Sequence, residues 1–393
     1  MNDKKSLIRI NYLLLLLLSS CIEKFVPEIP ESGGELVVEG YVTDQPEDYV
    51  IRLSRSRAID LKKSSPEIGA TVKILEGEAI EHQLTESADG AYVSKAGDFV
   101  GQVGSEYTLD IVTADGLHYQ SSTERMIKTP AIDSVYFERE VRFTDVEDLL
   151  VDGIKILVDT HDPTNSTRYY KWEWNEDWEY KATYPNSYGW VPGDRITDPG
   201  HPVFNPSPNV FCYNTNSSKQ VLIASTNTLE KEVLSRFEIK YVNTLGRELV
   251  SLYSILVKQY AISENAYKYW RELKGLSESQ GTLFDKQPYA LPGNVGNLND
   301  PEEVVLGYFE ALSVDEERIF IRREELKELD FPTNTCYYEK VDSVNYWTVQ
   351  DYLDQGYLIY GVGGFLTAFV HMVPRDCADC TYHGSLDKPD YLP

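Results

Sequence analysis

Short segments in which every second residue is apolar begin at residue 35 and recur at close spacing. Tyr49, Ile51 and Leu53, for example, fall on one face of an extended segment, and turn-forming pairs such as Asp89-Gly90 separate neighbouring segments. A period of two places one face of a strand against a core and the other in water. This pattern predicts a small β-sandwich over residues 35–128.

Longer strand patterns follow Pro130, and the most aromatic of them is RYYKWEWNEDWEY at 168–180. Ser263 is a suitable N-cap for a helix over 264–276, which carries an apolar stripe at helical spacing. The second part of the chain is therefore expected to be a larger, mainly β domain over residues 130–393 with one short helix.

The N-terminus has the three parts of a secretory leader. A basic start precedes a leucine run at 13–18, and Leu-Ser-Ser-Cys ends the segment at Cys21. The run is far shorter than the ~20 residues that a membrane-spanning helix needs. The ending resembles a bacterial lipobox, so residues 1–20 are predicted to be a signal peptide, Cys21 the acylated residue and 21–34 a tether. More than one acyl chain holds a protein stably on a membrane. The alternative is a short buried helix with a free cysteine.

The chain is strongly acidic, with a formal net charge of −26. Nucleic-acid binding needs a basic footprint, so this charge argues against a nucleic-acid partner. It also argues against contact between the body of the protein and an anionic lipid surface. The acidity favours a body that stands off the membrane or docks on another protein, or it serves solubility alone.

Several segments, taken in order, carry a resemblance to a known family. They are LVVEGYVTD, GATVKIL, YTLDIVTADGLHYQS, IDSVYF, RYYKW, QYAISENAYKYW, LFDKQPYALPGNVGN, VVLGYF and CADCT. Together with the lipobox they resemble the Bacteroidetes outer-membrane lipoproteins grouped as domain of unknown function 4249. The leading sandwich also resembles Ig-like and transthyretin-like modules.

The resemblance implies an outer-membrane lipoprotein that assists a TonB-dependent receptor in nutrient capture or uptake, and it implies no reaction. The residues after Cys21, Ile-Glu-Lys-Phe, are not the acidic cluster that some relatives use for surface export. The sequence is therefore compatible with a location on either the periplasmic face or the cell-surface face of the outer membrane.

The aromatic stretch offers candidate contact residues for a receptor, a glycan or a peptide. For Tyr170 to Trp174 a core strand with Trp172 buried is the favoured interpretation. The residues that continue into the following loop are the better candidates. They are Trp178, Tyr180, Tyr184, Tyr188 and Trp190.

No catalytic, metal-binding or cofactor-binding residue is nominated. Glu176 and Asp177 are adjacent on a predicted strand, so they face opposite sides and cannot flank one glycosidic bond. The Asn- and Asp-rich loop at 293–303 offers oxygen ligands for calcium, but ordinary turn chemistry explains it better. The sequence thus favours a non-enzymatic accessory lipoprotein. A surface glycan-binding or adhesion lipoprotein is the alternative, and a hydrolase is third.

The motif RDCADCTYHG places Cys377 and Cys380 two residues apart. Acidic neighbours disfavour the thiolate that redox chemistry needs, and Thr381 stands where haem attachment requires histidine. An exported protein keeps disulfides, and with Cys212 and Cys336 four thiols allow three pairings. Cys377–Cys380 with Cys212–Cys336 is the favoured pairing, followed by another pairing and then by a zinc site. In the favoured interpretation the motif is a staple near the C-terminus.

Overall fold

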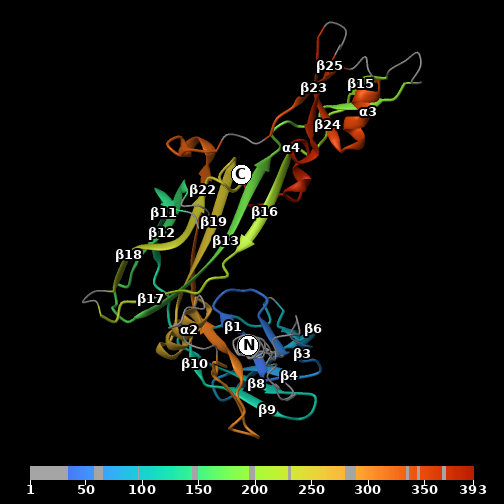
Figure 1. Ribbon diagram of the computed structural model, residues 1–393. Coiled ribbons are helices and arrows are strands. Elements are labelled where there is room, and N and C mark those ends of the chain that lie inside the picture. Colours follow the sequence, from blue (N-terminus) through green and yellow to red (C-terminus); the bar gives the residue numbers. More distant parts are fainter. Residues whose placement is uncertain are drawn as a thin grey trace, which may run out of the picture.

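The computed structural model describes residues 34–56, 65–95, 97–143, 149–193, 200–228, 232–278, 289–332, 336–342, 346–364 and 369–393. Strands dominate these residues, so the predicted mainly-β class is confirmed. Figure 1 shows an elongated molecule in three parts: a first sandwich at one end, a middle module, and a tip module at the far end.

The first sandwich consists of two sheets that enclose one core. The first sheet contains β21 (Leu306–Leu312), β1 (Leu36–Thr43), β2 (Val50–Arg55), β7 (Ala91–Val93) and β6 (Thr85–Ala88) in that order, with β3 (Ser65–Pro66) paired to β2. The second contains β20 (Val295–Asn297), β9 (His118–Ser121), β8 (Glu106–Val112), β4 (Thr71–Glu76) and β5 (Ile80–Gln83), with β10 (Glu124–Arg125) paired to β8. Tyr49, Ile51 and Leu53, which the alternation places on one face, are all buried in this core.

Two strands of this sandwich come from far along the chain. β21 pairs in parallel with β1, from Val37 opposite Leu306 to Thr43 opposite Leu312, and β20 pairs antiparallel with β9. The sequence assigned residues 130–393 as a whole to the second domain, whereas the structure places this part of them in the first sandwich. The pairing covers edges of β1 and β9 that would otherwise expose unpaired backbone groups.

The middle module packs two sheets around a second core. One sheet contains β11 (Ile132–Phe143), β12 (Leu150–His161) and β18 (Val233–Asn243). The other contains β16 (Phe211–Ser217), β13 (Tyr169–Lys181), β19 (Leu252–Ala261) and β22 (Val314–Arg322), with β17 (Leu222–Ser225) on β13, and a 3-10 turn η1 (Arg323–Leu326) follows β22. Tyr170, Trp172 and Trp174 lie in the core between the sheets, as the core-strand interpretation of this segment expects.

Helix α2 (Glu264–Ser277) covers the junction between the first two parts. The Ser263 side chain accepts a hydrogen bond from the Ala266 N–H at 3.1 Å, so the predicted helix and its cap are confirmed. β21 continues through Ser313 directly into β22. Asp44 of the first sandwich accepts the Ser313 hydroxyl at 2.7 Å and the Val314 N–H at 2.9 Å. These bonds fix the middle module to the first sandwich.

The tip module is a five-stranded sheet with short helices. Its strands are β15 (His201–Phe204), β14 (Tyr188–Val191), β24 (Tyr357–Gly363), β25 (Phe369–Pro374) and β23 (Glu339–Asp342), in that order. α3 (Tyr346–Asp354), α4 (Arg375–Ala378) and the 3-10 turn η2 (Cys380–Tyr382) accompany it, and the sequence analysis predicted none of these three. Within the described ranges, no helix combines the length and apolar character that crossing a membrane would require.

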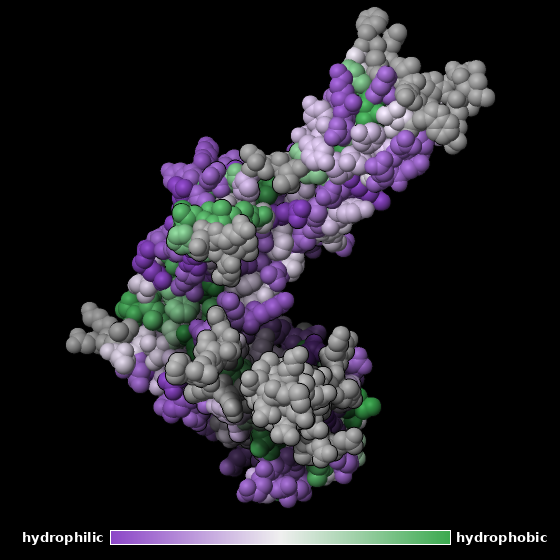
Figure 2. All heavy atoms as spheres, in the orientation of Figure 1, coloured by the Kyte–Doolittle hydropathy of each residue, from purple (hydrophilic) through white to green (hydrophobic). Residues whose placement is uncertain are grey.

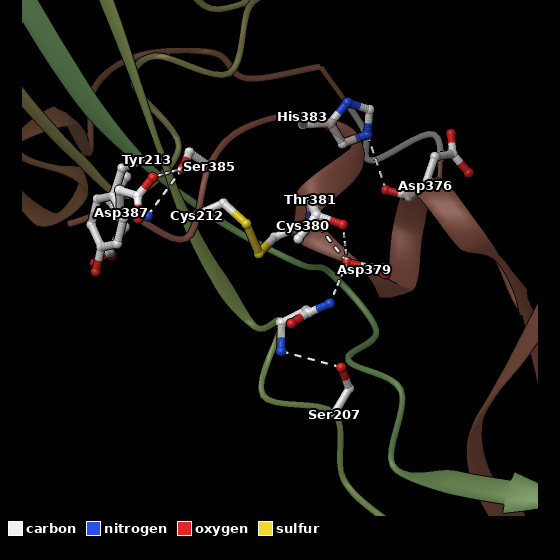
Figure 3. The surroundings of a disulfide bond; sticks show 12 residues. Ser207, Cys212, Tyr213, Asp376, Asp379, Cys380, Thr381, His383, Ser385 and Asp387 are labelled. Atoms are coloured by element: carbon white, nitrogen blue, oxygen red, sulfur yellow. Dashed lines mark hydrogen bonds between the residues drawn. A yellow bond between two sulfur atoms is a disulfide. The ribbon is translucent and has the colours of Figure 1, made fainter.

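Two disulfides join distant parts of the chain. Cys212 of β16 bonds Cys380 (Figure 3), and Cys336 bonds Cys377. The favoured pairing of Cys377 with Cys380 is therefore wrong. The segment around Cys380 lies against β16 instead, where the Cys380 N–H donates to the Asn209 carbonyl at 3.1 Å.

The aspartates of the motif have structural partners. Asp379 accepts the Thr381 N–H at 3.0 Å and the Asn209 amide at 3.1 Å, and the backbone carbonyl of Asp376 accepts from the His383 ring at 3.0 Å. The motif is thus a staple, but one that ties the end of the chain to β16 rather than closing on itself.

Candidate functional site: a cleft between the first sandwich and the middle module

The five aromatic residues proposed as contacts do not form one surface. Trp178 packs half-buried against the core of the middle module, and Tyr180 is buried beside Cys212 and Cys380. Trp190 packs against the core of the tip module. Only Tyr184 and Tyr188 line a concave surface. The predicted lipidation site, Cys21, lies outside the described residues.

That surface is a shallow depression on the tip module with a volume of about 570 Å³. The Tyr184 and Tyr360 ring centroids are 5.0 Å apart, and Tyr338 lies 4.5 Å from the His371 ring. Phe204 and Tyr338 are 68% and 46% exposed, so aromatic faces in the depression are open to solvent.

Glu176 and Asp177 each have a full set of structural partners on opposite sides of β13. Glu176 accepts from the Tyr253 hydroxyl at 2.7 Å and pairs with Lys240. Asp177 accepts from the Tyr391 hydroxyl at 2.6 Å and pairs with Arg318 at 3.1 Å. The two carboxylates therefore hold the middle module and the C-terminal segment together.

The loop at 293–303 uses its side chains for turn bonds. The Asn297 side-chain oxygen accepts the Asn299 N–H at 2.7 Å, and the Asn299 oxygen accepts the His118 N–H at 2.7 Å. The Glu303 carboxylate accepts from Tyr119 at 3.0 Å. Across the described ranges, no three histidine, cysteine or acidic side chains are arranged to hold a metal ion.

A deeper cavity lies where the first sandwich meets α2 and β13. It has a volume of about 450 Å³, and a neighbouring cavity of about 410 Å³ shares four lining residues with it: Tyr41, Lys171, Glu173 and Trp270. We call the two together the cleft. Small-molecule sites in proteins usually measure roughly 300–1,000 Å³, so either cavity is large enough to hold a ligand.

The first wall of the cleft follows from the register of β1 and β21. Glu39 pairs with Tyr308, and Tyr41 pairs with Glu310. Because side chains on a strand alternate between faces, these four residues share one face of the sheet. The opposite walls come from Tyr269 and Trp270 of α2 and from Lys171 and Glu173 of β13.

A buried ion pair lies in the wall of the cleft: Lys171 lines both cavities, and Glu310 lines the first. Lys171 and Glu310 are only 5% and 3% exposed, and the Lys171 ammonium lies 2.5 Å from a Glu310 oxygen. The other Glu310 oxygen accepts the Trp270 indole N–H at 3.0 Å. The ammonium also lies 4.7 Å from the Trp270 ring centroid and 5.3 Å from that of Tyr260. The pair thereby joins β13, β21 and α2 and has partners for its buried charges.

Negative charge exceeds positive charge around the first cavity. Its lining has five carboxylates, including Glu39, Glu47 and Glu173, against two cationic side chains, Lys171 and Arg52. Burial and repulsion from Glu310 and Glu39 raise the pKa of Tyr269 to about 12. Burial and repulsion from Glu173, Glu47 and Glu310 likewise raise the pKa of Tyr41. Burial is the larger cause of both shifts, and the carboxylates near the two tyrosines add to it.

The family model described as Domain of unknown function (DUF4249) matches residues 22–318. The chain belongs to this family. The match confirms the resemblance to domain of unknown function 4249, and the matched residues include every element that lines the cleft. Among curated proteins, none matches the chain.

The cleft of this DUF4249 protein is not predicted from the sequence, because β21 lies within residues 130–393, which were expected to form the second domain. Two signals pointed to the site: a lysine inside YYKWEW and Glu310 inside YFEAL, both charged residues in apolar strands. Such residues are rarely buried without a partner.

Proposed function

We propose that the protein is a lipid-anchored, non-enzymatic accessory of a TonB-dependent outer-membrane receptor, and that it captures a ligand in the cleft. The observation that carries this proposal is the cleft itself. It combines cavities of ligand size, aromatic walls and a buried ion pair. It lies between the first sandwich and the middle module, which hydrogen bonds hold together. Rigid walls lower the entropic cost of binding.

The roles of the carboxylates support binding rather than turnover. Glu310 is engaged by Lys171 and Trp270, and Glu173 accepts the Tyr260 hydroxyl at 3.1 Å. Glu176 and Asp177 stabilise the middle module from opposite faces of β13. These contacts give the acids structural and positioning roles.

The lipobox at Cys21 supports membrane anchoring. Residues 21–34 lead to β1, which forms one wall of the cleft. A fully extended chain spans at most ~3.6 Å per residue, so this tether keeps β1 within roughly 50 Å of the bilayer. The cleft would therefore lie near a receptor in the same membrane.

An apolar patch on the middle module supports a protein partner. Figure 2 shows apolar side chains beside the β11–β12 hairpin, where Phe143 is 69%, Leu149 53% and Leu150 57% exposed. Clustered apolar groups on a surface often mark protein interfaces. We assign this patch to the receptor.

Affinity purification from native outer membranes tests the proposal. The tagged full-length chain should recover a TonB-dependent receptor, and Phe143→Ser with Leu150→Ser should reduce recovery by about tenfold or more, which equals ~1.4 kcal/mol. Ile80→Ser is the matched control, because Ile80 is 52% exposed on the first sandwich, away from the patch. Cys21→Ser should release the protein from the membrane fraction. Repeated purification without a receptor, or a Cys21→Ser chain that stays in the membrane, would refute the proposal.

The tip depression favours a second candidate function, a surface glycan-binding or adhesion lipoprotein. Exposed aromatic faces such as Phe204 and Tyr338 suit stacking on sugar rings. Screening the chain against an oligosaccharide array tests it: binding should be lost in Tyr338→Ala and kept in Trp270→Phe. Equal binding by both variants would place the sugar elsewhere.

A further inference from the structure

We infer that the ligand of the first cavity of the cleft is an organic cation, a compound that carries ammonium or guanidinium groups on an apolar body. This inference rests on the proposed capture function and assigns a chemical class to its ligand.

The charge around the first cavity of the cleft favours a cation. Lys171 and Glu310 neutralise each other, so the other acids that line this cavity, among them Glu39, Glu47 and Glu173, face only Arg52. The second cavity adds Lys219 and Lys258, so the cationic ligand is assigned to the first cavity. Glu39 is exposed, and Glu47 and Glu173 are half-buried, so all three side chains reach solvent. An anionic ligand would meet repulsion there, and a neutral polyol would leave this excess charge uncompensated. A cation with more than one charged group matches it.

The aromatic lining of the first cavity also favours a cationic ligand. Tyr41, Tyr269, Trp270 and Tyr308 all line the first cavity. Ring faces attract cations, and an ammonium within about 6 Å of a ring centroid is stabilised when water is excluded. The cleft already contains one such contact, because the ammonium of Lys171 lies 4.7 Å from the Trp270 centroid. The same environment suits the cationic group of a ligand beside it.

The aromatic rings of the first cavity are held in place by contacts within the protein. Trp270 donates its indole N–H to Glu310, and Tyr269 lies 5.4 Å from the Trp270 ring and 4.9 Å from the Tyr308 ring. These contacts orient the rings before a ligand arrives. Pre-organised rings can accept the apolar body of the ligand while the acids at the opening accept its charged groups.

Calorimetry with a defined probe tests the inference. We choose L-arginine β-naphthylamide, which carries two cationic groups and a flat apolar body, and as its neutral counterpart N-acetyl-L-glutamine β-naphthylamide. At physiological salt the unmodified protein should bind the cationic probe at least about tenfold more tightly than the neutral one, a difference of ~1.4 kcal/mol.

Matched variants separate the cleft from the general acidity of the chain. Glu39→Gln with Glu47→Gln should weaken binding of the cationic probe about tenfold. Glu78→Gln with Glu302→Gln changes the net charge by the same amount at positions that do not line the cleft, and it should leave affinity unchanged. Glu47 accepts the Thr43 hydroxyl at 2.6 Å, and the amide oxygen introduced by Glu47→Gln can still accept it, so both double variants should have equal melting temperatures.

Three results would overturn the inference: no binding of the cationic probe, equal binding of the neutral probe, or equal loss in both double variants. If the cation fails to bind while the chain still recovers its receptor, the ligand class is wrong and the accessory role stands. If the cation binds in the cleft but no receptor is recovered, the accessory role is wrong and the ligand class stands.

Discussion

Replacing Lys171 by methionine tests whether the buried ion pair holds the cleft together. The change removes the ammonium and leaves the Glu310 carboxylate, 3% exposed, with the neutral Trp270 N–H donating to it. Breaking a buried pair from one side costs about 3–5 kcal/mol, because the other charge stays buried without compensation. Lys171→Met should therefore lower the free energy of unfolding by that amount.

Removing the other charge of the pair, that of Glu310, should lower the free energy of unfolding by less. In Glu310→Gln the Lys171 ammonium still has Glu173 at 3.8 Å, and the single amide oxygen can accept from either the ammonium or the Trp270 N–H but not from both. We expect a loss of ~1–3 kcal/mol. The double variant removes both charges and should lie within ~1–2 kcal/mol of the unmodified protein, so the two changes are strongly non-additive.

Guanidinium chloride unfolding of the chain from residue 22 onward, followed by tryptophan fluorescence, measures these differences. Lys258→Met is the matched control on the neighbouring strand, because its ammonium lies 3.9 Å from Glu316 in a more exposed pair, and it should cost at most ~1 kcal/mol. A loss below ~1 kcal/mol for Lys171→Met, or additive effects in the double variant, would refute the role assigned to the pair.

Because Cys212 and Cys380 are 168 residues apart, replacing both by serine should lower the free energy of unfolding by up to about 5 kcal/mol, measured by denaturation without reductant, and peptide mapping of the intact protein should find this bond. Gly307→Ala should destabilise the protein by more than ~1 kcal/mol, because its φ is +87° and a Cβ would lie 1.9 Å from a backbone oxygen, whereas Gly296→Ala, which meets no atom within 4 Å, should have little effect. Burial alone would raise the pKa of Asp162, but hydrogen-bond donors of the following turn hold that pKa well below its usual range. The ionised carboxylate therefore adds to the free energy of unfolding above about pH 4, and this stabilisation is lost as the pH falls through the pKa of the folded state. The stability difference between the unmodified chain and Asp162→Asn should accordingly narrow below about pH 4 in denaturation curves.

Local sequence patterns predicted individual helices and strands better than they predicted which strands pair with each other. The alternation around Ile51 and the cap at Ser263 describe single segments, and both are confirmed. The pairing of Val38 with Gly307 joins residues 269 positions apart, and no feature of either segment names the other. β21 was therefore expected in the second domain because of its position in the chain, and its place in the first wall of the cleft was not predicted.

The cysteines show the same limit. Cys377 and Cys380 stand on a helical turn and the 3-10 turn after it, so their short separation in sequence suggested a bond between them. In the fold, β16 and the segment before β23 lie closer to the two sulfur atoms. Spacing limits which pairings are sterically allowed, but the tertiary structure decides among them.

Charged residues inside apolar strands carried information that periodicity did not. Lys171 stands between two aromatic residues, and Glu310 stands between phenylalanine and alanine in an equally apolar strand. Burying either charge alone is costly, so a strand that buries one needs an opposite charge nearby. β13 and β21 each contain such a residue, of opposite sign. β13 also buries Glu176 and Asp177, which pair with Lys240 and Arg318, so charge alone leaves more than one partner open. The structure pairs Lys171 with Glu310, and this ion pair brings the two strands together beside the aromatic walls of the cleft.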